Sequence, residues 1–228
     1  MPYEDLAQAF RSGDIVYGLD GPRNTAINAI LSQGFKRQVK YRTMHFGCIP
    51  GKEQTRAVVL IQNDITNSVW DAQSPNQYSS NKAIGKTLQD SQRGQQFKAF
   101  LSNHPRYNVA QNNTIGTHGM VAATQSWQRT SKAGLEFQTR LRGGKVHFVV
   151  ELIIDSLDQV ATKTKYGTSI TSAELRWLFR HRGLTAVRDN VHFWLPDGEI
   201  SHDALFGRDE WNQYNPKHTY EDDDWEKR

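Results

Sequence analysis

The sequence predicts a soluble, single-domain α+β protein, and three observations support that prediction. The chain has 228 residues, a length that suits one domain and allows a sizeable buried core. It contains six Trp, eight Tyr and ten Phe, an aromatic content that disordered chains lack. Segments with the two-residue period of strands are interspersed with segments of helical periodicity.

The expected strands are short runs of β-branched and aromatic residues, at 14–17, 57–62, 119–124, 145–154 and 190–195. The run KVHFVVELII at 145–154 is the strongest of them. Its apolar residues fall on both faces of a strand, so we expect it at the centre of a sheet.

Helices are expected where apolar residues recur at three- and four-residue spacing, at 2–11, 25–31, 97–101 and 127–141. The stretch 63–94 is rich in Asn, Ser, Gln and Lys without a clear period, which indicates a long surface excursion.

Several classes of protein are disfavoured by composition. Cys48 is the only cysteine, so no internal disulfide can form, which suits a cytosolic working environment. No apolar run has the length of a membrane span, and residues 1–10 lack a signal-peptide pattern. The net charge of +4 is modest. No metal-ligand spacing, Walker loop or Gly-rich dinucleotide fingerprint is evident, since the glycines at 116, 119, 143 and 144 do not form one.

Three segments, taken in order, resemble the core of bacterial mono-ADP-ribosyltransferase toxins of the cholera and pertussis type, as found in C-terminal modules of Rhs and Tc polymorphic toxins. DIVYGLDGPRNTAINAILSQGF (14–35) is similar to the family's opening strand, turn and helix. GMVAATQSWQRTSKAGLEF (119–137) is similar to its Ser-Thr-Ser strand and the following helix. Residues 145–160 and 166–183 are similar to the next strand and to the loop that carries the catalytic glutamate.

The resemblance implies a fold of two packed, mostly antiparallel sheets with flanking helices and an NAD cleft. It implies one catalytic domain at 1–200, followed by a polar, acidic tail at 201–228. We expect this tail to be loosely attached, with Trp211 and Trp225 as candidate anchors.

The implied activity is that of a toxin or effector that cleaves NAD and transfers ADP-ribose to a macromolecule, protein or nucleic acid. NAD is then a substrate, and no metal is required. Such a protein is secreted or delivered by a specialised system and acts in the cytosol of a target cell. An immunity protein is a further implied partner, and no membrane is involved.

The resemblance assigns the catalytic carboxylate to Glu174, oriented by the hydroxyls of Thr124 and Ser126. A carboxylate is needed because cleavage of the nicotinamide–ribose bond passes through an oxocarbenium-like state that a fixed negative charge stabilises. Where the family has its Ser-Thr-Ser run, this chain has Ala122-Ala123-Thr124. Ser172 replaces the Gln or Glu that arginine-modifying members carry two residues before the glutamate.

NAD itself is assigned to Arg23, Arg42, Tyr17, Asp20 and Tyr166. The family places an arginine directly after Tyr17, where this chain has a glycine, so Arg23 and Arg42 are the candidate substitutes. A guanidinium suits the phosphates of NAD because it offers a planar fork of donors. Tyr17 and Tyr166 offer rings for stacking on nicotinamide, although Tyr17 is also a candidate core residue and Asp20 a turn residue.

Glu174 has a second interpretation. Thr171-Ser172-Ala173-Glu174 has the pattern of a capping box, in which Thr171 caps a helix and Glu174 bonds back to the cap amide. The two interpretations require different backbones. The family's loop needs Leu175, Trp177 and Phe179 to alternate along a strand, whereas capping places them on a helix.

Three other functions stay open. The same fold can act as an NAD glycohydrolase, in which water replaces the acceptor. Cys48 with His118 or His147 would form a Cys–His hydrolase or deamidase, although a lone cysteine is more often a small buried apolar residue. A catalytically dead module would use its basic surface to bind a partner such as RNA.

Substitution of Glu174 by Ala separates catalysis from capping. If Glu174 is catalytic, Glu174→Ala lowers the rate of nicotinamide release about a hundred- to a thousandfold while leaving the melting temperature nearly unchanged. If Glu174 only caps a helix, the variant loses about 1 kcal/mol of stability and cleaves NAD at the parent rate. Thermal melting and nicotinamide release measured on one preparation distinguish the two.

Overall fold

The computed structural model describes residues 1–11, 14–33, 46–49, 56–59, 96, 100, 104, 131–142, 144–164 and 169–221. Contacts divide the chain into two compact units, Met1–Lys36 with Gln138–Arg228, and Arg37–Phe137. We call them the sheet unit and the hairpin unit. Within the described residues, no helix has the length and apolar character that crossing a membrane requires.

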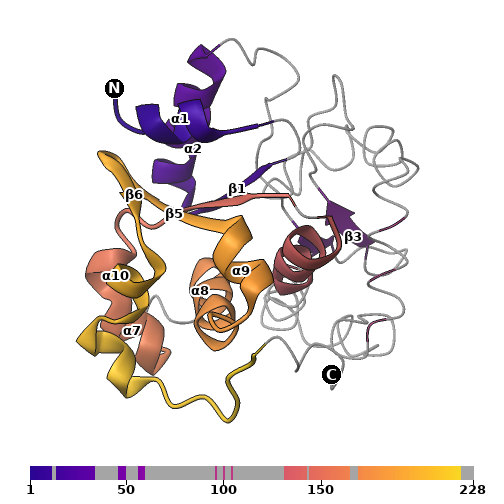
Figure 1. Ribbon diagram of the computed structural model, residues 1–228, viewed down its shortest axis with the longest axis vertical. Coiled ribbons are helices and arrows are strands. Elements are labelled where there is room, and N and C mark those ends of the chain that lie inside the picture. The colour runs from indigo at the N-terminus through magenta and orange to yellow at the C-terminus, as the bar shows by residue number, and fades with distance from the viewer. Residues whose placement is uncertain are drawn as a thin grey trace. The chain divides into compact units, whose positions relative to one another are not determined.

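The sheet unit contains a four-stranded sheet in the order β1-β4-β5-β6 (Figure 1). Strands β1, β4 and β5 are parallel, and β6 is antiparallel to β5. The strands are β1 (Ile15–Gly18), β4 (Val146–Val149), β5 (Val191–Leu195) and β6 (Gly198–Ile200). The central place expected for the 145–154 segment is thus confirmed, although the strand ends at Val149.

Helices flank this sheet on both faces, with α1 and α2 on one side and α7 to α10 on the other (Figure 1). The first pair is α1 (Glu4–Ala9) and α2 (Asp20–Ser32). The second group is α7 (Leu157–Thr162), α8 (Ile170–Arg180), α9 (Thr185–Asn190) and α10 (His202–Phe206). Three further helical segments are η3 (Phe137–Arg142), η4 (Ile154–Ser156) and η6 (Asp209–Gln213).

The α+β class with flanking helices is confirmed, but two packed, mostly antiparallel sheets are not what the sheet unit contains. Its one sheet is mostly parallel, because β1 pairs with a strand about 130 residues further along the chain. Periodicity identifies a strand, but it does not identify the neighbour with which that strand pairs. This is why the expected architecture was wrong while most expected strands were located correctly.

The two faces of the sheet differ in chemistry. Tyr17, Phe148 and Phe193 share the face toward α10, where Phe193 packs edge-to-face on Phe206 at 5.3 Å. The opposite face carries His147 and Trp194, both buried. Phe10, directly after α1, packs its ring 5.6 Å from that of His147. The apolar face supplies most of the core, and the other face holds a buried polar network.

His147 is the centre of that network. Its Nε2 lies 3.0 Å from Asp14 Oδ2, and Trp194 Nε1 donates to its Nδ1 at 3.0 Å. Because Nδ1 accepts a hydrogen bond, the ring proton sits on Nε2 and the imidazole is neutral. Burial lowers the pKa of His147 below its ordinary 6.5, against the opposing effect of the Asp14 hydrogen bond.

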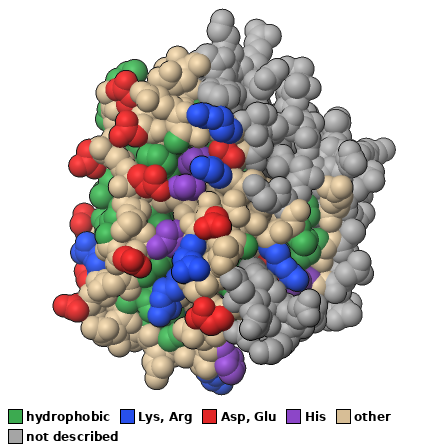
Figure 2. Space-filling model, viewed as in Figure 1, with side chains coloured by type: hydrophobic (Ala, Val, Ile, Leu, Met, Phe, Trp, Pro, Cys, Tyr) green, Lys and Arg blue, Asp and Glu red, His purple; other side chains and the backbone are tan. Residues whose placement is uncertain are grey.

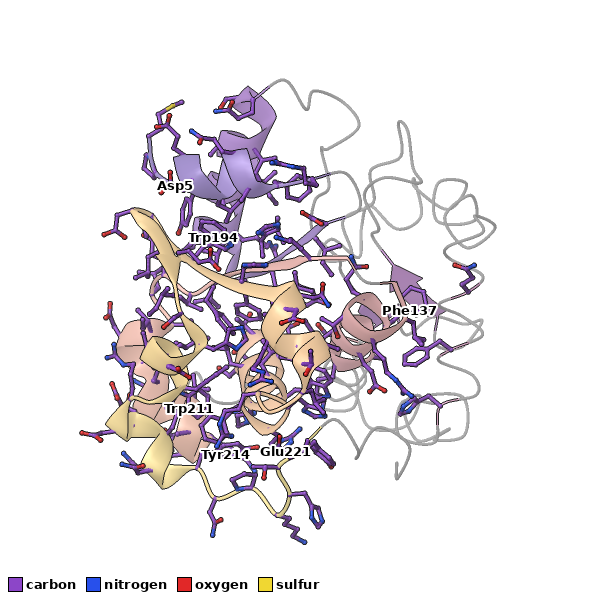
Figure 3. The ribbon with its side chains drawn as sticks, viewed as in Figure 1. Asp5, Phe137, Trp194, Trp211, Tyr214 and Glu221 are labelled. Atoms are coloured by element: carbon purple, nitrogen blue, oxygen red, sulfur yellow. The ribbon has the colours of Figure 1, made fainter. Side chains whose placement is uncertain are left out.

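Residues 201–214 pack tightly rather than loosely. Phe179 of α8 stacks on Trp211 at 4.5 Å and meets Tyr214 at 5.5 Å. Trp211 and Tyr214 are labelled in Figure 3. Arg180 donates to the Tyr214 hydroxyl at 2.6 Å. The anchor expected at Trp211 is confirmed, whereas Trp225 lies outside the described residues. The boundary expected at residue 200 stays a prediction.

The hairpin unit contains the antiparallel pair β2 (Phe46–Ile49) and β3 (Arg56–Val59). Helical residues 131–136 run directly into η3, a π-helical segment. Glu136, which is fully buried, lies 3.4 Å from His104 Nε2. The expected strand at 119–124 lies outside the described residues.

The neutral, buried His147 predicts a pH-dependent stability. Its folded pKa is below the unfolded value, so as pH falls below about 6.5 the unfolded chain binds the proton first and the free energy of unfolding decreases. We expect His147→Gln to flatten the pH dependence between pH 7 and 5, measured by urea unfolding. The free energy of unfolding of this variant should still decrease somewhat as the pH falls, because burial also lowers the pKa of His202.

His218→Gln, at an exposed position, is the matched control and should keep the parent slope. An unchanged slope in His147→Gln would show that His147 does not titrate differently in the folded chain.

Candidate functional site

The carboxyl ends of β1, β4 and β5 lie at one edge of the sheet, because the three strands are parallel and in register. In open sheets of parallel strands, ligands bind outside this edge. Among the described residues, three polar residues lie beyond the ends of these strands. Arg23 donates to the last residue of β1, and Tyr3 donates to Glu151, which follows β4. We call this group the carboxyl-edge cluster.

Arg23 is positioned by the turn between β1 and α2. The strand ends at Gly18 and the helix begins at Asp20, so only Leu19 lies between them. Arg23 is buried on the first turn of α2, and its Nη1 donates to the Gly18 carbonyl at 3.4 Å. The guanidinium is thus held beside the N-terminal end of a 13-residue helix. Backbone amides at such an end favour anionic groups.

Gly18 makes this tight turn possible. Its φ is +139°, and a Cβ there would lie 2.7 Å from the Val149 carbonyl oxygen. A glycine is therefore required where β1 approaches β4. Gly21 differs, since a Cβ there would meet no atom of the described residues outside its own helix turn within 4 Å. Gly21 is therefore not required by a close approach of the kind that constrains Gly18.

Glu151 and Tyr3 meet at the ends of β4 and β5. Glu151 follows β4 by two residues and is half-buried. The Tyr3 hydroxyl donates to Glu151 Oε2, and the Tyr3 amide donates to the Pro196 carbonyl at 2.7 Å. Tyr3 is 1% exposed. The phenol therefore fixes one oxygen of Glu151 and leaves the carboxylate partly accessible.

Burial raises the pKa of Tyr3 far above its ordinary value, and the hydrogen bond to the Glu151 carboxylate adds to this shift. Tyr3 is consequently protonated at every physiological pH and acts only as a donor to Glu151. It holds the carboxylate in place and does not take protons from it.

Chemically, the cluster combines a cationic fork, an oriented carboxylate and a helix N-terminal end. Arginine binds phosphates in bidentate fashion, and an oriented carboxylate can stabilise developing positive charge. This set suits an anionic ligand with an electrophilic centre, such as a nucleotide. Among the described residues, no group of three or more His, Cys, Asp or Glu side chains is placed to hold a metal ion.

Of the residues assigned to NAD by resemblance, Arg23 joins this cluster. Asp20 is the first residue of α2, at the same end of the sheet. Tyr17 lies instead in the apolar core, 2% exposed, with its ring stacked on Phe148 at 5.8 Å. Arg42 and Tyr166 lie outside the described residues, and their roles stay predictions.

Glu174 lies on α8, so the strand that the resemblance requires at 175–179 is not present. The capping interpretation is also wrong in its details. Ser169, not Thr171, caps the helix, and its hydroxyl accepts from the Ser172 amide at 3.0 Å. Glu174 is therefore in the second turn, and it is 4% exposed. Thr124 and Ser126 lie outside the described residues, so their proximity to Glu174 stays a prediction.

The alternative centred on Cys48 receives no support from His147. Cys48 lies on β2 opposite Ala57, in the hairpin unit. Both ring nitrogens of His147 are already hydrogen-bonded, one to Asp14 and the other to Trp194. His147 therefore has no nitrogen left to activate a thiol. His118, the other candidate base, lies outside the described residues.

Comparison of the chain with protein-family models, with curated proteins and with solved structures finds no match. The candidate site thus depends on geometry and chemistry alone.

The sequence contains one local signal for this site. Gly18 ends a strand and Gly21 lies in the first turn of the helix that follows, and phosphate-binding turns occur in this strand-to-helix setting. The expected helix began at residue 25, which hid this context, whereas α2 begins at Asp20. Nothing in the sequence pairs Tyr3 with Glu151, because 148 residues separate them.

Gly18→Ala should destabilise the protein by about 2–3 kcal/mol, because it combines a disfavoured backbone conformation with a contact of 2.7 Å. Gly21→Ala is the matched control in the same turn. It should leave stability unchanged or raise it by about 0.5 kcal/mol, since the new methyl meets open space within a helix. Urea unfolding of both variants checks this, and equal stabilities would contradict the close approach of β1 to β4.

Proposed function

We propose that the protein is an enzyme that binds NAD at the carboxyl edge of its parallel sheet and cleaves the nicotinamide–ribose bond. The observation that carries the proposal is the carboxyl-edge cluster. Arg23, in the first turn of α2, bonds to the last residue of β1, and Glu151 follows the end of the adjacent strand β4. The resemblance of residues 14–35 to the NAD-binding opening of ADP-ribosyltransferases adds support.

Each residue of the cluster has a part in this proposal. Arg23 and the N-terminal end of α2 hold the diphosphate of NAD. The resemblance also assigns Asp20, the first residue of α2, to NAD binding. Glu151, oriented by Tyr3, faces the anomeric carbon of the nicotinamide ribose.

Glu151 acts when the bond breaks. The electron pair of the bond leaves with nicotinamide, which departs as a neutral molecule, and positive charge develops on the ribose. A fixed carboxylate stabilises that charge more in the transition state than in bound NAD. An acceptor then attacks the anomeric carbon and loses its proton.

The acceptor distinguishes the two forms of the activity. A macromolecular acceptor, protein or nucleic acid, gives the transferase that the resemblance implies, and water gives a glycohydrolase. On the face shown in Figure 2, Lys and Arg side chains of the described residues are interspersed with Asp and Glu. That mixture favours an enzyme over a module that only binds RNA, because electrostatic binding of nucleic acid uses a patch of one sign.

Glu151→Gln is expected to lower kcat for nicotinamide release about a hundred- to a thousandfold, with little change in KM. The amide keeps the shape of the side chain and can still accept from Tyr3, but it removes the charge. Nicotinamide is measured after incubation with NAD, with and without a lysate as a source of acceptors. Labelled macromolecule is measured in parallel to detect transfer.

Two further variants are measured beside Glu151→Gln. Glu210→Gln, in η6 and paired with Arg208, is a matched control that should cleave at the parent rate. Glu174→Gln tests the carboxylate on α8. If that variant loses activity while Glu151→Gln does not, the site lies at Glu174. If the parent protein releases no nicotinamide under either condition, the proposed activity is wrong.

A further inference from the structure

Backbone strain is concentrated at the carboxyl edge of the sheet. Among the described residues, three that are not glycine have a positive φ: Tyr3 at 63°, Leu152 at 66° and Lys163 at 60°. Lys163 has an ordinary reason, because it ends α7 and its amide donates to the Gln159 carbonyl. The other two are joined through Glu151, which accepts from Tyr3 and directly precedes Leu152.

Leu152 occupies a turn position at which glycine or asparagine is usual. The amides of Ile153 and Ile154 both donate to the Val150 carbonyl, at 3.1 and 2.9 Å, so the chain turns sharply after β4. Leucine in the left-handed region is disfavoured by its Cβ. Glycine or asparagine at this position would therefore stabilise the turn more than leucine does.

The side chain of Leu152 contributes little to the core, since it is 57% exposed. Its neighbours along the chain, Val150 and Ile153, are at most 1% exposed. The left-handed backbone of an accessible leucine, directly after an oriented carboxylate, is an outlier from which a role in ligand binding can be inferred.

We propose that Leu152 is a substrate-contacting residue that packs on the nicotinamide ring of NAD and thereby selects the leaving group. This inference rests on the proposed NAD-cleaving function. Glu151 faces the anomeric carbon, and nicotinamide is the group bonded to that carbon. Leu152 directly follows Glu151 in the chain, and its exposed apolar side chain suits the flat, largely apolar face of the ring.

The test compares three ligands that share parts of NAD. Leu152→Asn, in which asparagine tolerates the left-handed backbone, should weaken binding of NAD and of nicotinamide mononucleotide about tenfold. Binding of ADP-ribose, which lacks nicotinamide, should stay within about twofold of the parent. Dissociation constants are measured by calorimetry and KM by nicotinamide release. The melting temperature should not fall, because the substitution relieves strain at an exposed position.

Three further variants isolate the cause. Leu152→Met keeps an apolar side chain and should retain parent affinity for NAD. Leu141→Ala removes another exposed leucine, 53% accessible and on η3, and should have no effect on any ligand. Lys163→Gly relieves a similar backbone strain on α7 and should likewise leave binding unchanged.

The outcomes separate this inference from the proposed function. If the parent cleaves NAD and Leu152→Asn binds all three ligands normally, Leu152 is not a contact, and only this inference is overturned. Equal weakening toward all three ligands, ADP-ribose included, also overturns the assignment to nicotinamide. If the parent neither binds NAD nor releases nicotinamide, the proposed function fails and the role of Leu152 fails with it.

Discussion

The hydrogen-bonded chain from Asp14 through His147 to Trp194 is the interaction on which the rest of the sheet unit depends. It links β1, β4 and β5 on one face, and all three side chains are buried. Asp14 also accepts from the backbone amides of Arg11 and Lys145, which ties the start of β1 to the start of β4. If any of these strands shifted its register by one residue, its residue of the network would move to the opposite, apolar face, and the other buried polar groups would lose their partner. The network therefore specifies the register of the parallel strands.

The correct register in turn aligns the carboxyl ends of the strands. Ile15 to Gly18 pair with Val146 to Val149, so the turn after β1 and the turn after β4 leave the sheet side by side. Arg23 and Glu151 reach one edge for this reason. Satisfied polar groups lie near the starts of β1 and β4, and strained backbone lies beyond their ends. Such a division is expected where stability and function occupy opposite edges of one sheet.

How much of the site the sequence could predict differs from residue to residue. Arg23 was assigned by the resemblance, as the nearest substitute for the arginine that the family places directly after Tyr17. Glu174 was singled out from the sequence, but its backbone conformation could not be predicted. The run ITSAELRWLFR fits both the two-residue alternation of a strand and the apolar stripe of a helix. In the folded chain Leu175, Leu178 and Phe179 are buried together, and their three- and four-residue spacing places them on one side of a helix. Tyr3 and Glu151 could not be paired in advance, since their contact requires the N-terminal segment to cross the ends of β4 and β5.

The sequence by itself predicted strands at 14–17, 145–154 and 190–195, a helix after the first of them, and a central place for the second. The structure has strands at 15–18, 146–149 and 191–195. These follow from local periodicity and side-chain shape, which act over a few residues. Only the tertiary structure decided that the strands are parallel, that residues 201–214 fold onto α8, and that a buried phenol orients Glu151. Each of these joins residues that are far apart in the chain. Such contacts are chosen by which arrangement buries the most apolar surface while pairing every buried polar group, and that choice depends on the whole chain at once.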